Sequence, residues 1–287
     1  MRQYKRSITA TIGEDDGTAV TIRNLYMEFE LEKESTSKPN DGNLRIYNLN
    51  ESTETQIRER GVRIRLTAGY DGNESLLFDG DIRKVEKERE ALDRVTVIIL
   101  GGNVNKLTNA EFIRSYEGAV SLRTIVSDAV PSFNLLVDGL DEIPDNVFLN
   151  DFVWSGRTGD MLNRILEPQG IQWYENDGAI GFSTRNRSTD PMIYDINART
   201  GMVGSPTITD RGIQVKTLLN PRLRINGKVR ITSDILVDPA SSDDQSARAS
   251  EYQGIYKINK IRHNGTNRKG RFQTEIVVTP LETESQT

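Results

Sequence analysis

The side chains of this chain that could do chemistry are mainly carboxylates, and four of them lie in one short stretch: Asp138, Asp141, Glu142 and Asp145. A calcium loop alternates its oxygen ligands around a central glycine and ends on a bidentate acid, and this spacing does not supply that pattern. The pairs Asp15-Asp16 and Asp243-Asp244 lie in polar, turn-like sequence, whereas a general acid needs burial that raises its pKa. We interpret these acids as solvated. A hydrolase site built from carboxylates that are distant in the sequence stays open as an alternative.

Histidine and cysteine chemistry is limited by composition, because His263 is the only histidine and there is no cysteine. Disulfides, thiolate zinc sites, cysteine nucleophiles and a His-based metal cluster within one chain are therefore excluded. His263 lies at a strand end beside a turn, where a structural role is expected. The run Gly101-Gly102-Asn103 lacks the Lys-Ser/Thr of one nucleotide-binding motif and the third glycine of the other, so it is interpreted as a strand exit. We expect no catalytic residue, metal or cofactor.

Charge and hydropathy narrow the function classes further. The 287 residues include 37 Lys plus Arg against 42 Asp plus Glu, a net charge of −5, which argues against a nucleic-acid binder with a broadly basic surface. The longest apolar run, Val95 to Leu100, is far shorter than the roughly 20 residues that span a bilayer. We expect a multi-domain chain that is made in a cytoplasm and does not insert into a membrane.

The first hundred residues predict strands, because apolar and polar residues alternate with a period of two. Turns are expected at Asp71-Gly72 and Asp79-Gly80, where glycine permits a tight reversal. One helix interrupts the strands; Ser52 or Thr53 could cap it, and Gly61 ends it. The expected strands are 44–47, 62–66, 76–78, 82–85 and 95–100.

The middle third predicts a small α+β unit. Helical spacing of apolar residues indicates helices over 119–130 and 158–167, with a loop over 134–145 between them. A hairpin over 171–182 follows, with its turn at Asn176-Asp177-Gly178.

The last third returns to strands. Alternation predicts strands over 213–215, 223–225 and 229–231, with Asn226-Gly227 as a hairpin turn between the last two. Residues 237–250 are small and polar and cannot bury enough surface to order themselves. Two further strands, 255–261 and 272–281, flank a turn over 264–270. The order along the chain is therefore sheet, α+β insert, sheet.

Two stretches resemble the baseplate or tail hub proteins of tailed bacteriophages, a group that includes the Mu-like and T-even hubs and the late control protein D family. The first runs from Gly42-Asn-Leu-Arg-Ile-Tyr-Asn-Leu49 through the helix ending at Gly61 to Leu77-Phe-Asp-Gly-Asp-Ile82. The second runs from Leu218-Leu-Asn-Pro-Arg-Leu-Arg-Ile-Asn-Gly-Lys-Val229 into 254–265 and ends in 272–281. The segment 151–182 is similar to the small α+β domain of such hubs.

The resemblance implies a mainly β (α+β) fold in which two tail-tube-like β-barrel domains flank a small α+β domain. The implied limits are 1–105 for the first barrel, 106–190 for the α+β domain and 191–287 for the second barrel, with a flexible loop near 237–250. The positions that match the family's sequence motifs have an implied structural or assembly role. They are Asn43, Tyr47, Asn48, Asn220, Pro221, Gly227, His263 and Gly265.

The resemblance also implies a non-enzymatic virion protein of the tail baseplate, present in the host cytoplasm before assembly. Three chains would form a ring with pseudo-six-fold symmetry that joins the tail tube protein to the central spike protein and lets DNA pass without specific binding. The tape measure protein and other baseplate proteins would be further partners. The alternatives that stay open are a distal tail protein, a hub of a tail-derived bacteriocin or secretion device, a cell-wall glycan hydrolase, and a carbohydrate-binding tail module that uses Trp154 or Trp173.

Overall fold

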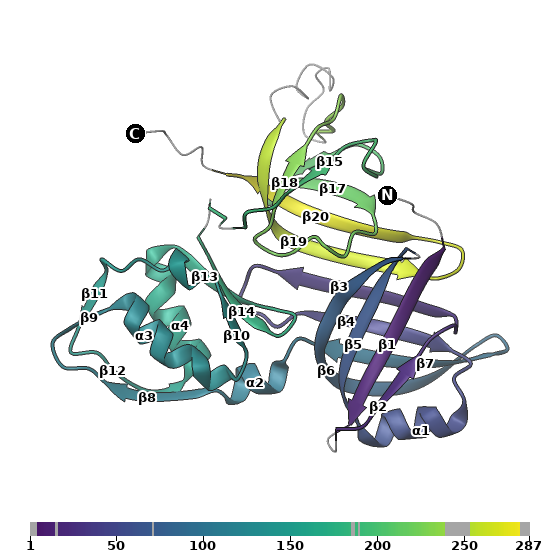
Figure 1. The fold of residues 1–287 in the computed structure, drawn as a ribbon, viewed down its shortest axis with the longest axis horizontal. Coiled ribbons are helices and arrows are strands. Elements are labelled where there is room, and N and C mark those ends of the chain that lie inside the picture. The colour runs from purple at the N-terminus through teal and green to yellow at the C-terminus, as the bar shows by residue number, and fades with distance from the viewer. Residues whose placement is uncertain are drawn as a thin grey trace.

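The computed structural model describes residues 5–14, 17–70, 72–184, 187–188, 190–238 and 253–281, and strands predominate in them (Figure 1). The helices are α1 (Glu51–Arg60), α2 (Val104–Asn109), α3 (Leu122–Ala129) and α4 (Thr158–Leu166), with 3-10 turns η1 (Val130–Phe133), η2 (Leu140–Glu142) and η3 (Glu167–Gln169). The strands of the first half are β1 (Arg6–Glu14), β2 (Ala19–Ile22), β3 (Met27–Glu34), β4 (Asp41–Tyr47), β5 (Gly61–Tyr70), β6 (Asn73–Glu90) and β7 (Asp93–Gly101). Those of the middle are β8 (Glu111–Ser115), β9 (Ala119–Ser121), β10 (Leu136–Asp138), β11 (Phe148–Asn150), β12 (Val153–Arg157), β13 (Ile171–Asn176) and β14 (Ala179–Thr184). The last are β15 (Ile193–Ile196), β16 (Thr207–Thr209), β17 (Gly212–Leu218), β18 (Lys228–Ile231), β19 (Gly254–Thr266) and β20 (Phe272–Pro280).

One large sheet joins the two ends of the chain. Its path is β16-β17-β20-β19-β3-β4-β7-β6-β5-β1-β2, and β18, with β15 beside it, pairs with β19 off this path. The seam is the antiparallel pairing of β3 with β19, so we call β1–β7 the first half-sheet and β15–β20 the second half-sheet. At the ends of the path, β2 and β16 have no further strand partner among the described residues. The mainly β fold is thus confirmed, while no closed barrel is found in the described part of the chain.

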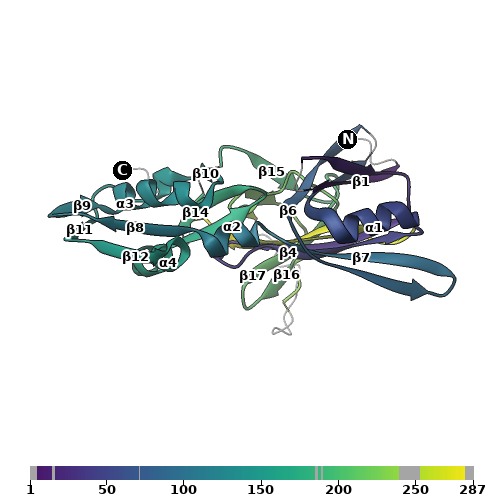
Figure 2. The same ribbon diagram turned by 90° about the horizontal axis from the view of Figure 1, so that it is seen from below.

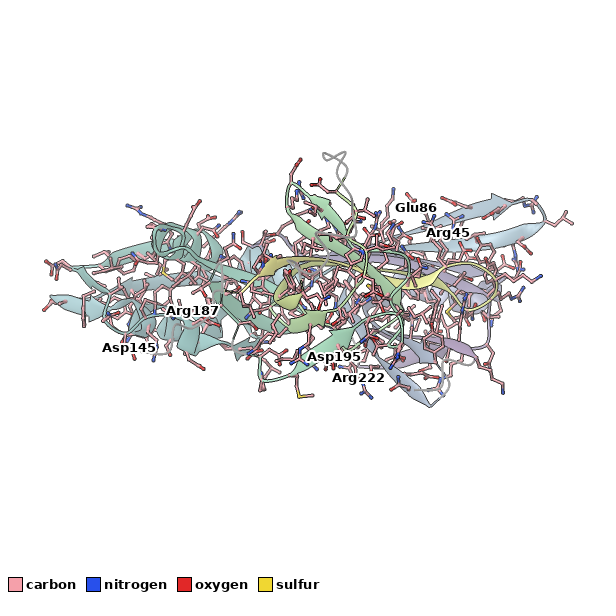
Figure 3. The ribbon with its side chains drawn as sticks, turned by 90° about the horizontal axis from the view of Figure 1, so that it is seen from above. Arg45, Glu86, Asp145, Arg187, Asp195 and Arg222 are labelled. Carbon is pink, nitrogen blue, oxygen red and sulfur yellow. The ribbon has the colours of Figure 1, made fainter. Side chains whose placement is uncertain are left out.

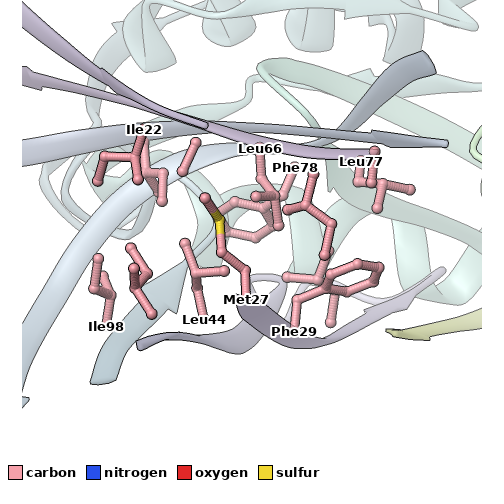
Figure 4. Packing of buried hydrophobic residues seen from close by; sticks show 14 of the residues in the cluster. Ile22, Met27, Phe29, Leu44, Leu66, Leu77, Phe78 and Ile98 are labelled. Carbon is pink, nitrogen blue, oxygen red and sulfur yellow. The ribbon is translucent and has the colours of Figure 1, made fainter. Parts of the chain in front are cut away.

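The first half-sheet bends over its own apolar core. β6 pairs with β5 along its first part and with β7 along its second, and its register with β7 shifts between Ile82 and Lys84. Figure 4 shows side chains of β3 and β4, such as Met27 and Leu44, facing Leu66 of β5. Figure 2 shows the end of the β6–β7 hairpin projecting beyond this half-sheet.

The two turns expected in this half-sheet have different outcomes. The turn at Asp79-Gly80 is wrong, because both residues lie inside β6 and pair with β5. At the other, Gly72 takes a positive φ of 77° between β5 and β6, and Asp71 lies outside the described residues.

Helix α1 closes one end of this core through Ile57, which is buried. Its N-cap is Asn50, whose side chain accepts a hydrogen bond from the Thr53 amide at 2.8 Å. The expected cap at Ser52 or Thr53 is therefore wrong. Glu51 in the first turn and Gly61 at the C-cap are the residue types that favour a helix start and end.

The α+β unit has a separate core beneath α3 and α4, and it lies at the left of Figure 1. Both expected helices are confirmed, although α3 begins only at Leu122, where the Ser121 hydroxyl accepts from the Thr124 amide at 3.1 Å. The hairpin β13–β14 is confirmed as well, with Asp177 and Gly178 at positive φ in its turn. The expected loop over 134–145 contains the edge strand β10 and the turn η2.

The second half-sheet packs β17, β18, β19 and β20 around a third apolar core. Asn226 takes a positive φ of 65° as expected of a turn residue, but the expected hairpin is wrong. Residues 223–225 form no strand, and β18 pairs with β15 in parallel and with β19. Of the stretch 237–250, positions 239–250 lie outside the described residues.

We predict that Phe272→Ala lowers the free energy of unfolding by about 3–5 kcal/mol, the usual effect of removing a buried aromatic side chain. Phe272 is 1% exposed and packs edge-on against Tyr70 at 5.4 Å and Phe29 at 6.1 Å between ring centres, so it joins the two half-sheets. The matched control is Phe148→Ala, because Phe148 is 58% exposed. Urea unfolding measures both, and equal small losses would contradict this role.

Candidate functional site

The seam between the half-sheets carries alternating charges on one face. β3 reads Met-Glu-Phe-Glu-Leu-Glu-Lys-Glu, so its odd-numbered residues are buried and its glutamates lie on the opposite, outer face. Across the seam, Lys260 of β19 binds Glu32 at 2.6 Å and Glu34 at 2.5 Å. Arg262 of β19 pairs with Glu30. Ion pairs therefore tie the half-sheets together on the outer face.

The outer face continues over the neighbouring strands. Arg45 of β4 binds Glu88 at 3.0 Å and Glu90 at 3.1 Å, both on β6. In Figure 3, Arg45 and Glu86 are labelled close together on the same part of the sheet. The alternation of side chains along each strand, and its register with the next strand, place further charged side chains on the same face of the sheet. Acids outnumber bases here: Glu28, Glu30, Glu32, Glu34, Asp41, Glu86, Glu88, Glu90 and Glu275 against Arg45, Lys84, Lys216, Lys260 and Arg262.

On the inner face of the seam, the turn of the β13–β14 hairpin docks against β3. Lys33 is 4% exposed and forms an ion pair with Asp177 in that turn. A buried lysine without an anion would be strongly unfavourable, so Asp177 is a required partner for it. This pair links the α+β unit to the large sheet.

We call the contact between the α+β unit and the large sheet the junction. Besides the Lys33–Asp177 pair it contains Glu175, which is 2% exposed. Its Oε1 accepts from the Asn103 side chain at 2.8 Å and from the Gly178 amide at 2.9 Å. Its Oε2 accepts from the Asn40 side chain at 3.0 Å. A Cβ on Gly102 would lie 2.3 Å from Oε2, so glycine at this position leaves room for the carboxyl. Three segments of the chain therefore meet at one side chain.

Burial raises the pKa of the Glu175 carboxyl from 4.5 to about 7. The hydrogen bonds from Gly178 and Asn103 and the charge of Lys33 act in the opposite direction, while the charge of Asp177 adds to the rise. The folded chain thus binds this proton more tightly than the unfolded chain does.

A second polar contact joins the α+β unit to the second half-sheet. Lys257 of β19 is 2% exposed and donates to the Ser183 hydroxyl at 2.6 Å and to the Thr184 carbonyl. Ser183 in turn donates to the Asn226 side chain at 3.1 Å. Burial lowers the pKa of Lys257 to about 8, and the charge of Glu142 opposes this. Both halves of the large sheet are therefore held to the same hairpin.

Two of the eight positions that match the family's sequence motifs lie on β4. Tyr47 is stacked on Tyr26 at 4.3 Å between ring centres, and burial raises its pKa to about 12. Asn43 lies on the outer face opposite Glu30. Both residues contribute to the outer face of the sheet.

Asn48 follows β4 directly and has a positive φ of 54°. Its side chain donates to Asp93 at 2.7 Å and accepts from the Arg94 amide at 3.1 Å. These bonds fix the start of β7 beside the end of β4.

His263 and Asn220 are brought together by Thr274. The Asn220 amide donates to the Thr274 hydroxyl at 3.0 Å, and that hydroxyl lies 2.9 Å from Nδ1 of His263. The Thr274 hydroxyl therefore contacts both groups, since a hydroxyl can take part in more than one hydrogen bond. Burial and the charge of Lys33 lower the pKa of His263 to about 3. His263 is therefore a neutral structural group.

The remaining family positions are packing and turn residues. A Cβ on Gly265 would lie 2.5 Å from the Phe272 ring and 3.0 Å from the Phe29 ring, so this glycine allows β19 to approach both. The Gly227 carbonyl accepts from the Ile258 amide at 2.9 Å, and Pro221 lies in a turn after β17. An assembly role for the eight positions stays a prediction.

Two of the four acids considered for catalysis form local contacts, while Asp138 and Asp141 are exposed. Asp145 pairs with Arg123 at 2.6 Å, and Glu142 accepts from Thr184 at 3.4 Å. No group of three or more His, Asp or Glu side chains that could hold a metal occurs in the described parts of the chain. Asp15-Asp16 and Asp243-Asp244 lie outside those parts. Among the residues that the structure describes, no helix is long and apolar enough to cross a membrane.

The two tryptophans do not present a stacking platform. Trp173 is 5% exposed, stacks on Phe133 at 5.5 Å between ring centres and donates to Asn163 at 2.7 Å. Trp154 packs against the core of the α+β unit, with the Arg164 guanidinium 5.9 Å from its ring centre. Both rings are used in packing.

The junction residues Lys33, Asn40 and Glu175 are not among the residues expected from the sequence, and Asn103 is expected only as part of a strand exit. One signal was available: Lys33 occupies the buried register of an alternating strand, where a charge needs a partner. The partner itself, Asp177, is 144 positions away, and alternation within a strand carries no information on it.

Comparison with known proteins gives one family match. Residues 7–253 match the model of the family Baseplate hub gp41. No curated protein matches the chain by sequence.

Solved structures share the fold over most of the chain. A tail protein from Neisseria meningitidis is 9% identical, with a TM-score of 0.57 and 96% of each chain covered. The 43 kDa tail protein of prophage MuSo2 from Shewanella oneidensis is 10% identical, with a TM-score of 0.57 over 96% of this chain and 97% of that one. The E. coli c3393 protein, a type VI secretion component described as similar to T4 tail proteins gp27 and gp5, is 12% identical at a TM-score of 0.57 over 90% of this chain and 74% of that one. At these identities the likeness concerns the fold alone.

We predict that Glu175→Gln removes the loss of folding stability that the Glu175 carboxyl causes as the pH rises from about 4.5 to 7. The folded-state pKa of about 7 exceeds the ordinary 4.5, so this carboxyl contributes stability below pH 4.5 that is lost as the pH rises through 7. The loss corresponds to about 3 kcal/mol. Urea unfolding across this pH window should show the wild type becoming less stable relative to the variant.

The matched control is Glu117→Gln, because Glu117 is exposed. Its stability difference from the wild type should not vary with pH in the same way. A stability difference between the wild type and Glu175→Gln that stays constant across the window would contradict the buried, protonated carboxyl.

Proposed function

The chain belongs to the Baseplate hub gp41 family and is a structural protein of the phage tail baseplate, and on that premise we propose that three copies form a ring joining the tail tube to the central spike. The ring has pseudo-six-fold symmetry on the tube side and three-fold symmetry on the spike side. Its role is non-enzymatic, and the chain reaches the virion from the host cytoplasm.

The seam between β3 and β19 is the observation that carries this proposal. It holds two half-sheets with separate apolar cores in one chain, so three chains supply six half-sheets. We propose that each half-sheet acts as a tube-like barrel domain, with limits at 1–105 and 191–287 and the α+β domain at 106–190. The fold shared with solved tail proteins supports this assignment.

An open strand edge supports ring formation. Within the described residues, β2 ends the path of the large sheet without a further strand partner, whereas the outer edge of β16 is bridged to Val237. Exposed edges invite pairing with other chains, and a closed ring satisfies them without open-ended aggregation. The tail tube protein, the spike protein, the tape measure protein and other baseplate proteins are the proposed partners.

We assign the outer face of the seam to the wall of the channel. Its acids outnumber its bases, and repulsion between carboxylates and phosphates lets DNA pass without binding. Several of its bases are held in ion pairs, such as Lys260 with Glu32 and Arg45 with Glu88, so they are less available to DNA.

The fold likeness to a type VI secretion component supports one second candidate, a hub of a tail-derived secretion device. The same ring would serve there, and the genes beside this one separate the two candidates.

We predict that electron microscopy of the purified protein shows three-fold rings with a central hole. The chain lacks cysteine, so Glu86→Cys carries a single gold label on β6, where the outer face of the seam continues. The label should lie at the edge of the hole, and a label at Glu117→Cys in the α+β unit should lie away from it. Rings with the position-86 label on the outside would overturn the channel assignment, and the absence of rings would count against the hub.

A further inference from the structure

The turn between β19 and β20 gathers basic side chains from both ends of the sequence. Arg268, Lys269 and Arg271 are exposed in it, and we call these three residues the basic turn. Arg6 of β1 donates to the carbonyls of Arg268 and Gly270, both at 2.9 Å, which fixes the turn on the first half-sheet.

The basic turn forms no ion pair with another described residue. No ion pair joins Lys269 or Arg271 to a described carboxylate, and the Arg268 guanidinium lies 4.9 Å from the centre of the Tyr26 ring. Glu28 and Glu30 of β3 line one cleft with Lys269 and Arg271, where Glu28 accepts from Tyr26 and Glu30 pairs with Arg262. In a chain of net charge −5, such a surface points to an anionic partner.

The α+β unit carries a complementary surface on the edge strand β10. Asp138 ends this strand and Asp141 follows it, and both are exposed. Beside them Leu136 is 77% exposed and Val137 is 40% exposed. β10 pairs only with β14 in the described structure, so its other edge is open. We call Leu136, Val137, Asp138 and Asp141 the acidic edge; it combines exposed apolar area, an open strand edge and negative charge, as protein interfaces do.

The two surfaces lie apart from one another within one chain. Figure 1 labels β10 near the middle of the view, on the side of the α+β unit next to the large sheet, and places the β19–β20 turn toward the right. A contact between them therefore joins two copies head to tail, and a head-to-tail contact with the right rotation closes into a ring.

We infer that the basic turn of one copy binds the acidic edge of the next copy, an interaction that rests on the proposed ring. The charged groups are exposed, so their attraction mainly selects and orients the neighbour. The contact weakens as the ionic strength rises, because salt screens exposed charges.

Cross-linking between two single-cysteine variants tests this contact on a background without cysteine. Lys269→Cys and Asp141→Cys are purified with tags of different mass, mixed and treated with a short bismaleimide. The mixed product should exceed the two like-with-like products several-fold and fall several-fold at high salt. The matched control replaces Lys269→Cys with Leu92→Cys, because Leu92 is 98% exposed and lies at the tip of the β6–β7 hairpin.

Each result decides the inference. A mixed product no more abundant than the Leu92→Cys control overturns it; if the protein nevertheless has the mass of three chains, the ring stands and only this contact fails. Arg271→Glu should reduce the mixed product, and Asp138→Lys on the opposite partner should restore it. Failure of that rescue, or a Lys269→Glu variant that loses retention on DNA instead, would show that the basic turn does not bind the acidic edge.

Discussion

The antiparallel pairing of β3 with β19 is the contact on which the rest of the structure depends. It joins distant parts of the chain, since Lys260 and Glu34 are 226 positions apart, and it makes one sheet of two half-sheets. On one side of this seam, side chains of both strands form a ladder of ion pairs. On the other side, the same two strands bury Lys33, His263 and Gly265. A shift of one residue would exchange these two sides, since successive residues of a strand face opposite ways.

The buried side of the seam explains how the α+β unit is held. Lys33 requires an anion, and the β13–β14 turn supplies Asp177. The same hairpin places Glu175 against Asn40 and Asn103, and it places Ser183 against Lys257. Polar contacts of one hairpin thus connect three apolar cores. This arrangement keeps the basic turn and the acidic edge at a distance from each other within one chain.

Local patterns predicted about half of the elements, but they missed the seam strand β3, the short strands β8–β12 and the pairing of the strands. The helix over 158–167 and the hairpin at Asn176-Asp177-Gly178 follow from apolar spacing and turn chemistry, and both are confirmed. The turn predicted at Asp79-Gly80 is wrong, because pairing with β5 keeps these two residues in an extended strand although their types favour a turn. The partners of Lys33 and Glu175 could not be predicted, since they depend on how distant segments pack. The resemblance to phage hubs predicted the family that the comparison confirms.

The mass of the purified protein in solution, measured by light scattering, tests the central claim most directly. One chain has a mass of 32.3 kDa, and a ring of six half-sheets requires three chains. We predict three times the chain mass, decreasing at high salt because salt screens the exposed charges of the head-to-tail contact. The mass of a single chain at every concentration and salt would contradict a ring built by this protein alone.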